Sequence, residues 1–195
     1  MMTEEFPTFG IACDIDDTIS DTGGHLENIT QKKFGHSDNF SPDEKEWVER
    51  QLLTNEFYDN MPTVKGAQKA LEDISALIPI YAYISSRPTT VLTSTTNWLI
   101  KNGFPKAAVL LRDNIQINGH AWKADILMKK YPDIRGIIDD SVELADALPK
   151  NYKGFVFILT KKNYKNFNLD LYTGPRWGEI VNLVHKVHKR LIQAN

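Results

Sequence analysis

Short apolar runs alternate with amphipathic segments along most of the chain, and this alternation limits the folds that the sequence can adopt. The runs lack the polar alternation of half-exposed strands, so each predicts a strand that is buried on both faces. The predicted strands are Phe9 to Ile15, Ile78 to Ile84, Gly136 to Ile138 with its flanks, Phe155 to Leu159 and, as a fifth candidate, Ala107 to Leu111.

Helical patterns lie between these strands. They cover Val64 to Leu77, Thr89 to Asn102, Ala121 to Tyr131, Val142 to Leu148 and about Trp177 to Ile192. Strands that alternate with helices pair in parallel through right-handed crossovers. We therefore expect an α/β fold with a doubly wound, mostly parallel sheet.

One long segment, Ile19 to Met61, interrupts this alternation before the first crossover helix. It exceeds the usual length of a strand-to-helix loop, which indicates an insertion. A helix is expected through Leu26 to Phe34, after the pair Gly23 and Gly24. A second helix is expected to start at Ser41, with Ser41 as the cap and a proline in the first turn. We expect a small helical cap at residues 19–61 and a core of residues 1–18 and 62–195.

The composition excludes several classes of protein. A single cysteine, Cys13, allows no intrachain disulfide and is typical of a reducing compartment, so we expect a cytoplasmic protein. The acidic start of the chain lacks the features of a signal peptide, and no apolar stretch approaches the length of a membrane span. The net charge of -2 gives no indication of a nucleic acid partner.

Basic residues gather in two short groups. One contains Lys161, Lys162 and Lys165, and the other contains Lys186, His188, Lys189 and Arg190. Each group could attract a phosphate, or it could be a solvated loop or helix face, which is the commoner case.

Polar residues follow three of the predicted strands. Ligands of open α/β sheets bind outside the carboxyl ends of strands, so these residues are candidates for a functional site. They are Asp14, Asp16 and Asp17 at the end of the first strand, Ser85, Ser86 and Arg87 at the end of the next, and Asp139 and Asp140 at the end of a third. Crowded carboxylates repel one another unless a cation joins them. Oxygen ligands without paired histidines or cysteines favour a hard ion, and magnesium fits such a set.

Each feature taken singly also has a simpler explanation. Asp14 to Thr18 could form a turn with a helix cap, and Ser85 or Ser86 could be caps as well. Lys123 alone is more often a surface lysine, and Asp139 with Asp140 could cap the next helix. Independent caps have no reason to converge on one edge of a sheet, so their joint occurrence favours a single site.

The set resembles the haloacid dehalogenase superfamily. Asp14-Ile15-Asp16-Asp17-Thr18 is similar to its nucleophile motif, Ser85 to its second motif, Lys123 to its motif-three lysine, and Asp139-Asp140 to its acidic fourth motif. The resemblance implies a magnesium-dependent phosphomonoester hydrolase that forms an aspartyl phosphate on Asp14.

The same resemblance implies a role for each matched residue. Asp16 would protonate the leaving oxygen and then activate water, which requires a pKa raised toward neutrality. The metal ligands would be Asp14, Asp16, Asp139 and Asp140, and Ser85 and Lys123 would bind the substrate phosphate. Apart from the resemblance, the turn at Ser86 and Arg87 lies near a helix start, where its backbone amides can also bind the phosphate. Ser85 and Lys123 complete the catalytic set.

The substrate is less constrained. Asn55 to Pro62 resembles the 5'(3')-deoxyribonucleotidase branch of the superfamily, which implies nucleoside monophosphates as substrates. Phe57 and Tyr58 could stack on a base, but packing against the core is the favoured alternative. Sugar phosphates or other small phosphomonoesters remain open, as does phosphotransfer. A noncatalytic phosphate-binding module would not need both Asp14 and Asp16, and dehalogenation would not need Asp16.

Overall fold

The computed structural model describes residues 9–131 and 133–194. The acidic start of the chain, where no signal peptide is expected, lies outside these residues. Strands form at β1 Gly10–Cys13, β2 Ile80–Pro88, β3 Ala108–Arg112, β4 Ile134–Asp139, β5 Phe155–Leu159 and β6 Asp170–Gly174. Within the described ranges they make one parallel sheet in the order β3-β2-β1-β4-β5-β6. This confirms the predicted fold class.

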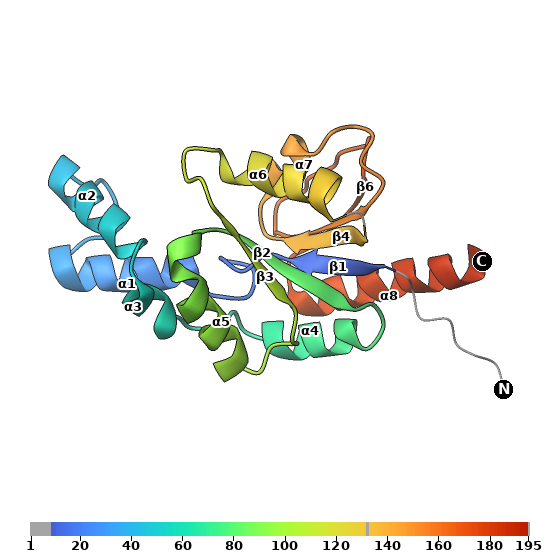
Figure 1. Ribbon diagram of the computed structural model, residues 1–195, viewed down its shortest axis with the longest axis horizontal. Coiled ribbons are helices and arrows are strands. Elements are labelled where there is room, and N and C mark those ends of the chain that lie inside the picture. Colours follow the sequence, from blue (N-terminus) through green and yellow to red (C-terminus); the bar gives the residue numbers. More distant parts are fainter. Residues whose placement is uncertain (1–8, 132, 195) are drawn as a thin grey trace.

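Helices cover both faces of the sheet (Figure 1). The helices that flank it are α4 Ala67–Ser75, α5 Leu92–Lys101, α6 Gly119–Asp125, α7 Val142–Ala147 and α8 Trp177–Ala194. On one face Ile11 packs in a core cluster with Leu71 of α4 and Ile180 of α8. On the other face Ala12 shares a second cluster with Leu144 of α7. Adjacent residues of β1 thus enter opposite cores, because side chains alternate along a strand.

Three further helices extend beyond the end of the sheet at which β1 stops (Figure 1, blue to cyan). They are α1 Thr22–Phe34, α2 Pro42–Gln51 and α3 Asn55–Asp59. The predicted start of α2 is confirmed, because Ser41 and Glu44 form a reciprocal capping box. Helix α1 begins earlier than expected, since the Asp21 side chain accepts from the amide of Gly24. The division into a core and a cap of residues 19–61 stays a prediction.

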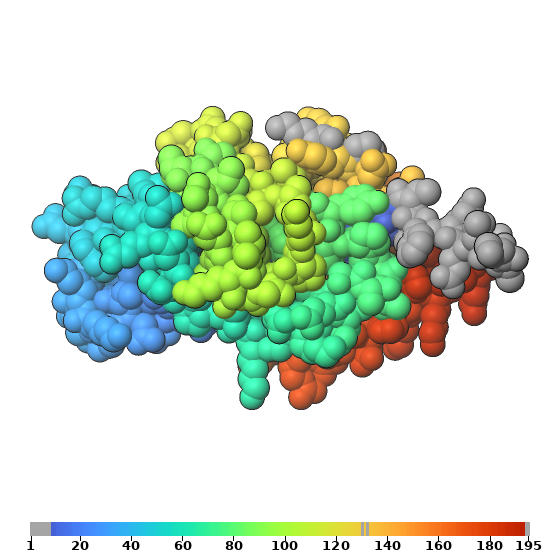
Figure 2. Space-filling model, turned by 60° about the horizontal axis from the view of Figure 1, so that its bottom comes forward, coloured from blue at the N-terminus to red at the C-terminus, as the bar shows by residue number. Residues whose placement is uncertain are grey.

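The segment around α3 is fixed to α5, and in Figure 2 their cyan and yellow-green atoms lie against each other. Ser94 Oγ donates to Asn55 Oδ1 at 2.9 Å, and Trp98 Nε1 donates to the carbonyl of Met61 at 2.7 Å. Phe57 and Tyr58 are buried in the core cluster. This confirms the packing alternative for the two aromatic rings and leaves them no exposed face for a base.

Other elements differ from the prediction. The expected helix at 121–131 begins at Gly119, because the Asn118 side chain caps it, and it continues from α6 into a single π turn, Ile126–Lys130. A short 3₁₀ turn, Thr89–Val91, precedes α5. Strand β6 and helix α3 had no counterpart in the prediction. No helix among the described residues has both the length and the apolar character needed to cross a membrane.

Candidate active site

The polar residues after β1, β2 and β4 meet at one edge of the sheet. Asp14 directly follows β1, and its amide donates to the carbonyl of Ile138 on β4 at 2.8 Å. This bond ties the start of the loop to the neighbouring strand. The chain then turns at Asp17, which adopts a left-handed φ of 56°, a conformation that aspartate tolerates better than most residues. The turn is held by the amide of Gly23, which donates to Asp17 Oδ1 at 2.7 Å.

Thr18 links two of the carboxylates. Its hydroxyl lies 3.2 Å from Asp14 Oδ2 and 3.1 Å from Asp140 Oδ1. Its carbonyl accepts from the indole of Trp177, the first residue of α8, at 3.2 Å. Helix α8 therefore fixes the loop after β1, although it is distant in the sequence.

Lys123 supplies the positive charge nearest to Asp14. It lies on α6 and is only 4% exposed. Its Nζ is 2.7 Å from Asp14 Oδ1 and 2.7 Å from Asp139 Oδ2. Burial alone would lower the pKa of Lys123, but the charges of Asp139 and Asp14 outweigh burial and raise it above its usual value. Lys123 therefore stays charged between the two carboxylates.

Asp14, Asp139 and Asp140 form a compact carboxylate trio. Each offers an oxygen, and these oxygens all lie within 4.8 Å of one another. Burial raises the pKa of Asp14 well above its usual range against the opposing charge of Lys123, and Asp139 raises it further. Burial, with the charge of Asp139, raises the pKa of Asp140 to about 6. These shifts reflect the free-energy cost of holding several negative charges together in a poorly solvated place.

The trio fits a hard divalent cation. Asp14 Oδ1 is buried, and its nearest charged neighbour is Lys123 Nζ at 2.7 Å. Three carboxylates that each offer an oxygen to one small region form an all-oxygen donor set, which is typical of magnesium sites. Asp139 Oδ1 is already held by the amide of Ser141 at 2.9 Å, which orients that carboxylate.

Asp16, the fourth predicted ligand, is not part of the trio. Its carboxylate forms an ion pair with Arg87, in which Nη2 lies 2.8 Å from Oδ1 and Nε lies 3.0 Å from the same oxygen. Ser85 Oγ donates to Asp16 Oδ2 at 2.7 Å, and Thr22 Oγ1 donates to Oδ1 at 2.7 Å. Four donor groups on three side chains thus surround this carboxylate.

The expected rise in the pKa of Asp16 is wrong for this structure. Burial alone would raise the pKa, but the charge of Arg87 and the hydrogen bonds from Arg87, Thr22 and Ser85 hold it below its usual value. The sequence shows the carboxylates but not that Arg87 pairs with Asp16, so it gives no sign of this opposing charge.

Arg87 was expected to meet a substrate anion, and its guanidinium is instead enclosed by protein groups. It is 3% exposed, and besides Asp16 it donates to Ser20 Oγ at 3.0 Å and to Thr95 Oγ1 at 3.3 Å. The guanidinium also lies 4.2 Å above the ring of Tyr58 from α3. No pattern in the sequence indicated this set of partners, which come from the loop after β1, from α3 and from α5.

The two serines after β2 have different surroundings. Ser85 is fully buried, and its oxygen accepts from the amide of Arg87 at 3.1 Å while donating to Asp16. Ser86 is half-buried and lies against Gly119 at the start of α6, where a β-carbon would collide with Ser86 Oγ. Glycine at position 119 therefore allows α6, which carries Lys123, to approach the end of β2.

Thr22 and Trp177 contact residues of the site, and the sequence did not predict a role for either. Both act through contacts with the loop after β1, and neither belongs to a motif. Thr18 was part of the quoted motif, but its bridging of Asp14 and Asp140 depends on the fold. These roles depend on tertiary contacts that spacing along the chain does not encode.

No protein family model matches this chain, and neither does any curated protein. Solved structures do match. A haloacid dehalogenase-like family hydrolase from Streptococcus pneumoniae aligns with a TM-score of 0.60 at 14% identity, over 90% of this chain and 97% of that chain. A haloacid dehalogenase family hydrolase from Deinococcus radiodurans, with bound phosphate and sodium, aligns with a TM-score of 0.53 at 12% identity, over 94% and 98%.

A third structure is the L-2-haloacid dehalogenase from Xanthobacter autotrophicus with chloropropionic acid covalently bound. It aligns with a TM-score of 0.54 at 12% identity, over 90% of this chain and 98% of that chain. Similarity at these identities concerns the arrangement of the backbone. The chain therefore has the fold of the haloacid dehalogenase superfamily of hydrolases.

Proposed function

We propose that this chain hydrolyses phosphomonoesters in a magnesium-dependent reaction, with Asp14 as a covalent nucleophile. The observation that carries the proposal is the environment of Asp14, which is buried, lies beside Asp139 and Asp140, and has Lys123 Nζ 2.7 Å from its Oδ1. Asp14 would form a bond to phosphorus while the bond from phosphorus to the leaving oxygen breaks. Water would then cleave the aspartyl phosphate and release inorganic phosphate.

The residues around Asp14 support this chemistry. Lys123 offsets the charge of the nucleophile and of the transferring group, and its two ion pairs hold it in place for this purpose. In the proposal Asp14, Asp139 and Asp140 hold magnesium. Bound there, the ion would supply further positive charge to the phosphoryl oxygens.

We propose that the substrate phosphate replaces the Asp16 carboxylate as the partner of Ser85 and Arg87. Both residues donate to Asp16 in the structure, so they can bind phosphate only after this exchange. The exchange would also separate Asp16 from Arg87, whose charge favours the ionised form of Asp16, and would therefore let the pKa of Asp16 rise. Asp16 could then donate a proton to the leaving oxygen and later accept one from the attacking water. In this scheme Ser86 contributes at the rim of the phosphate site.

Dehalogenation is the second candidate, because a dehalogenase with a covalently bound substrate is among the structures similar to this chain. The carboxylate trio favours phosphate chemistry, since displacement of a halide by a carboxylate gives Asp139 and Asp140 no metal to hold. A noncatalytic phosphate-binding module and a phosphotransferase remain alternatives for the experiment to separate.

The test measures phosphate release from nucleoside monophosphates, sugar phosphates and phosphorylated hydroxy acids. Each is assayed with magnesium and with excess chelator, for wild type, Asp14→Asn and the control Asp73→Asn. Asp73 is a partly exposed residue that pairs with Lys69. The proposal expects metal-dependent release by wild type and the control, and none by Asp14→Asn. Release that continues in Asp14→Asn contradicts the proposal.

Halide release from a 2-haloacid without phosphate release supports dehalogenation, and an alcohol acceptor that becomes phosphorylated supports phosphotransfer.

The same panel compares substrate classes. Activity confined to nucleoside monophosphates supports the nucleotidase alternative. Phe57 and Tyr58 give that alternative no support, because both rings are buried. We therefore place small phosphomonoesters first.

A further inference from the structure

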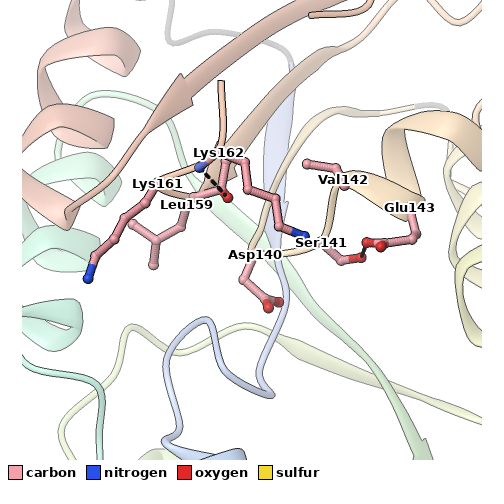
Figure 3. A pocket seen from close by; sticks show the side chains of 8 residues that line it. Asp140, Ser141, Val142, Glu143, Leu159, Lys161 and Lys162 are labelled. Carbon is pink, nitrogen blue, oxygen red and sulfur yellow. Dashed lines mark hydrogen bonds between the residues drawn. The ribbon is translucent and has the colours of Figure 1, made fainter. Parts of the chain in front are cut away.

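A cavity of about 410 Å³ lies beside the carboxylate trio (Figure 3). It is formed by residues 140–143, which are the loop after β4 and the start of α7, and by residues 159–162, which are the end of β5 and the loop that follows. We call it the lysine pocket, after Lys161 and Lys162. Asp140 belongs to both the pocket and the trio, so the two sites share a wall.

The pocket contains two cations without a carboxylate partner. Among the described residues neither Lys161 nor Lys162 takes part in an ion pair. In Figure 3 the Lys162 side chain extends across the pocket toward the loop that carries Asp140 and Ser141. The turn that places it is held by the Lys162 amide, which donates to Thr160 Oγ1 at 3.2 Å.

Two acidic side chains also line the pocket, and neither neutralises the lysines by contact. Glu143 accepts from Ser141 Oγ at 2.5 Å, which turns its carboxylate toward the serine. Asp140 accepts a hydrogen bond from Thr18, and one of its oxygens lies with those of Asp14 and Asp139 in the trio. If a cation binds the trio, the charge of Asp140 is offset, and the two lysines outweigh the single charge of Glu143, so the pocket keeps a net attraction for anions.

We propose that the lysine pocket binds a second anionic group of the substrate, while the ester phosphate lies at Asp14. The preferred phosphomonoesters would then carry a carboxylate or a second phosphate a few bonds from the ester phosphorus. This inference rests on the proposed function for the position of the first phosphate. It favours small acidic phosphomonoesters over nucleoside monophosphates, whose base is neutral.

Three phosphonates test the inference without turnover, because their carbon–phosphorus bond takes the place of the ester bond. Propylphosphonate has one anionic group, 3-phosphonopropionate adds a carboxylate, and propane-1,3-diphosphonate adds a second phosphonate. Dissociation constants are measured by calorimetry in the presence of magnesium. The proteins are wild type, the double variant Lys161→Ala with Lys162→Ala, and the control Lys153→Ala, which removes an exposed lysine outside the pocket.

We expect wild type to bind at least one of the two diacids about fivefold more tightly than propylphosphonate, as partly exposed ion pairs allow. The double variant should lose this preference and keep its affinity for propylphosphonate, and Lys153→Ala should behave as wild type. The diacid that binds more tightly shows whether the pocket prefers a carboxylate or a second phosphate group. Equal affinities in wild type, or a preference that survives in the double variant, overturn the inference.

The binding test of the lysine pocket and the phosphate-release test of the proposed function can fail independently of each other. If phosphate release depends on Asp14 but wild type shows no diacid preference, the lysine pocket does not bind a second anionic group, and the hydrolase proposal still holds. A lysine-dependent diacid preference without any phosphate release supports the pocket and refutes the hydrolase. Where both hold, the double variant should raise KM for a phosphorylated hydroxy acid and leave kcat unchanged, because a contact equal in ground and transition states affects binding alone.

Discussion

Arg87 and Asp16 form an ion pair at the end of β2, with Arg87 Nη2 2.8 Å from Asp16 Oδ1. The Arg87 side chain is 1% exposed and that of Asp16 is 28% exposed. The guanidinium joins the loop after β1 to α3 and α5 through Asp16, Tyr58 and Thr95. The pair thus serves the stability of the fold as well as the proposed phosphate site.

Replacing Arg87 should destabilise the protein strongly. Arg87→Met leaves Asp16 without its cation and removes several buried hydrogen bonds, so we expect a loss of about 2–3 kcal/mol in the free energy of unfolding. This lies below the full value for a buried pair because Asp16 is partly exposed. Urea denaturation measures it. Arg50→Met is the matched control, since its pair with Glu46 is exposed, and it should cost less than about 0.5 kcal/mol. Equal losses in the two variants would contradict the structural role of Arg87.

The contact between Gly119 and Ser86 predicts a second, steric effect. Gly119→Ala places a methyl group against Ser86 Oγ, so we expect a loss of about 1–3 kcal/mol in the free energy of unfolding. Adding Ser86→Ala removes the closest atom and should restore part of that loss.

Gly178 provides the control for this substitution. It lies in α8, and a β-carbon there would meet nothing within 4 Å. Gly178→Ala should leave stability unchanged or increase it by up to about 1 kcal/mol, because alanine favours the helix. Thermal or urea unfolding of wild type and the three variants completes the comparison, and a neutral Gly119→Ala would be evidence against the close approach of α6 to β2.

Much of the fold was predictable because its signals are local. The runs at β1, β2, β4 and β5 are buried on both faces, so their composition alone identifies strands. Strand β6 was missed because Asp170–Gly174 lies at the edge of the sheet and is mostly half-exposed, which removes the continuous apolar pattern. Helix α3 was missed because its five residues are too few for a helical period to be recognised.

The site was predictable to a smaller extent. Strand ends identify which side chains share an edge, and Asp14, Lys123, Asp139 and Asp140 do lie together. The orientation of Asp16 was not predictable, because it depends on Arg87, which reaches it from a different strand. The expectation of a raised pKa for Asp16 was wrong for the same reason, and the support that Trp177 gives to Thr18 leaves no local signal in the sequence.

Metal binding should stabilise the protein through the carboxylate trio. A cation relieves the repulsion among Asp14, Asp139 and Asp140, so magnesium at about 100 times its dissociation constant should add about 2.7 kcal/mol to the free energy of unfolding. For a chain of this length the melting temperature should rise by about 5–10 °C. Asp140→Asn should reduce this shift, and the control Asp73→Asn should retain it. An equal shift in both variants would place the metal elsewhere.

The Trp177 indole should act as a positioning group for the loop after β1. Trp177→Phe keeps most of the buried apolar surface but leaves the carbonyl of Thr18 without its donor, which should cost about 1 kcal/mol in stability. Because Thr18 contacts Asp14 and Asp140, we also expect the magnesium dissociation constant to rise. Calorimetric titration with magnesium measures it. An unchanged constant would mean that the indole has a packing role alone.

The central claim is that Asp14 itself becomes phosphorylated. The most direct measurement mixes the enzyme with magnesium and a substrate from the active class, quenches the reaction in acid within one turnover, and maps phosphoryl groups on peptides by mass spectrometry. We predict one phosphoryl group on Asp14, removed by hydroxylamine as expected for an acyl phosphate and missing from Asp14→Asn. Turnover by wild type with a phosphoryl group on another residue, or with none on the peptide that contains Asp14, would contradict the proposal.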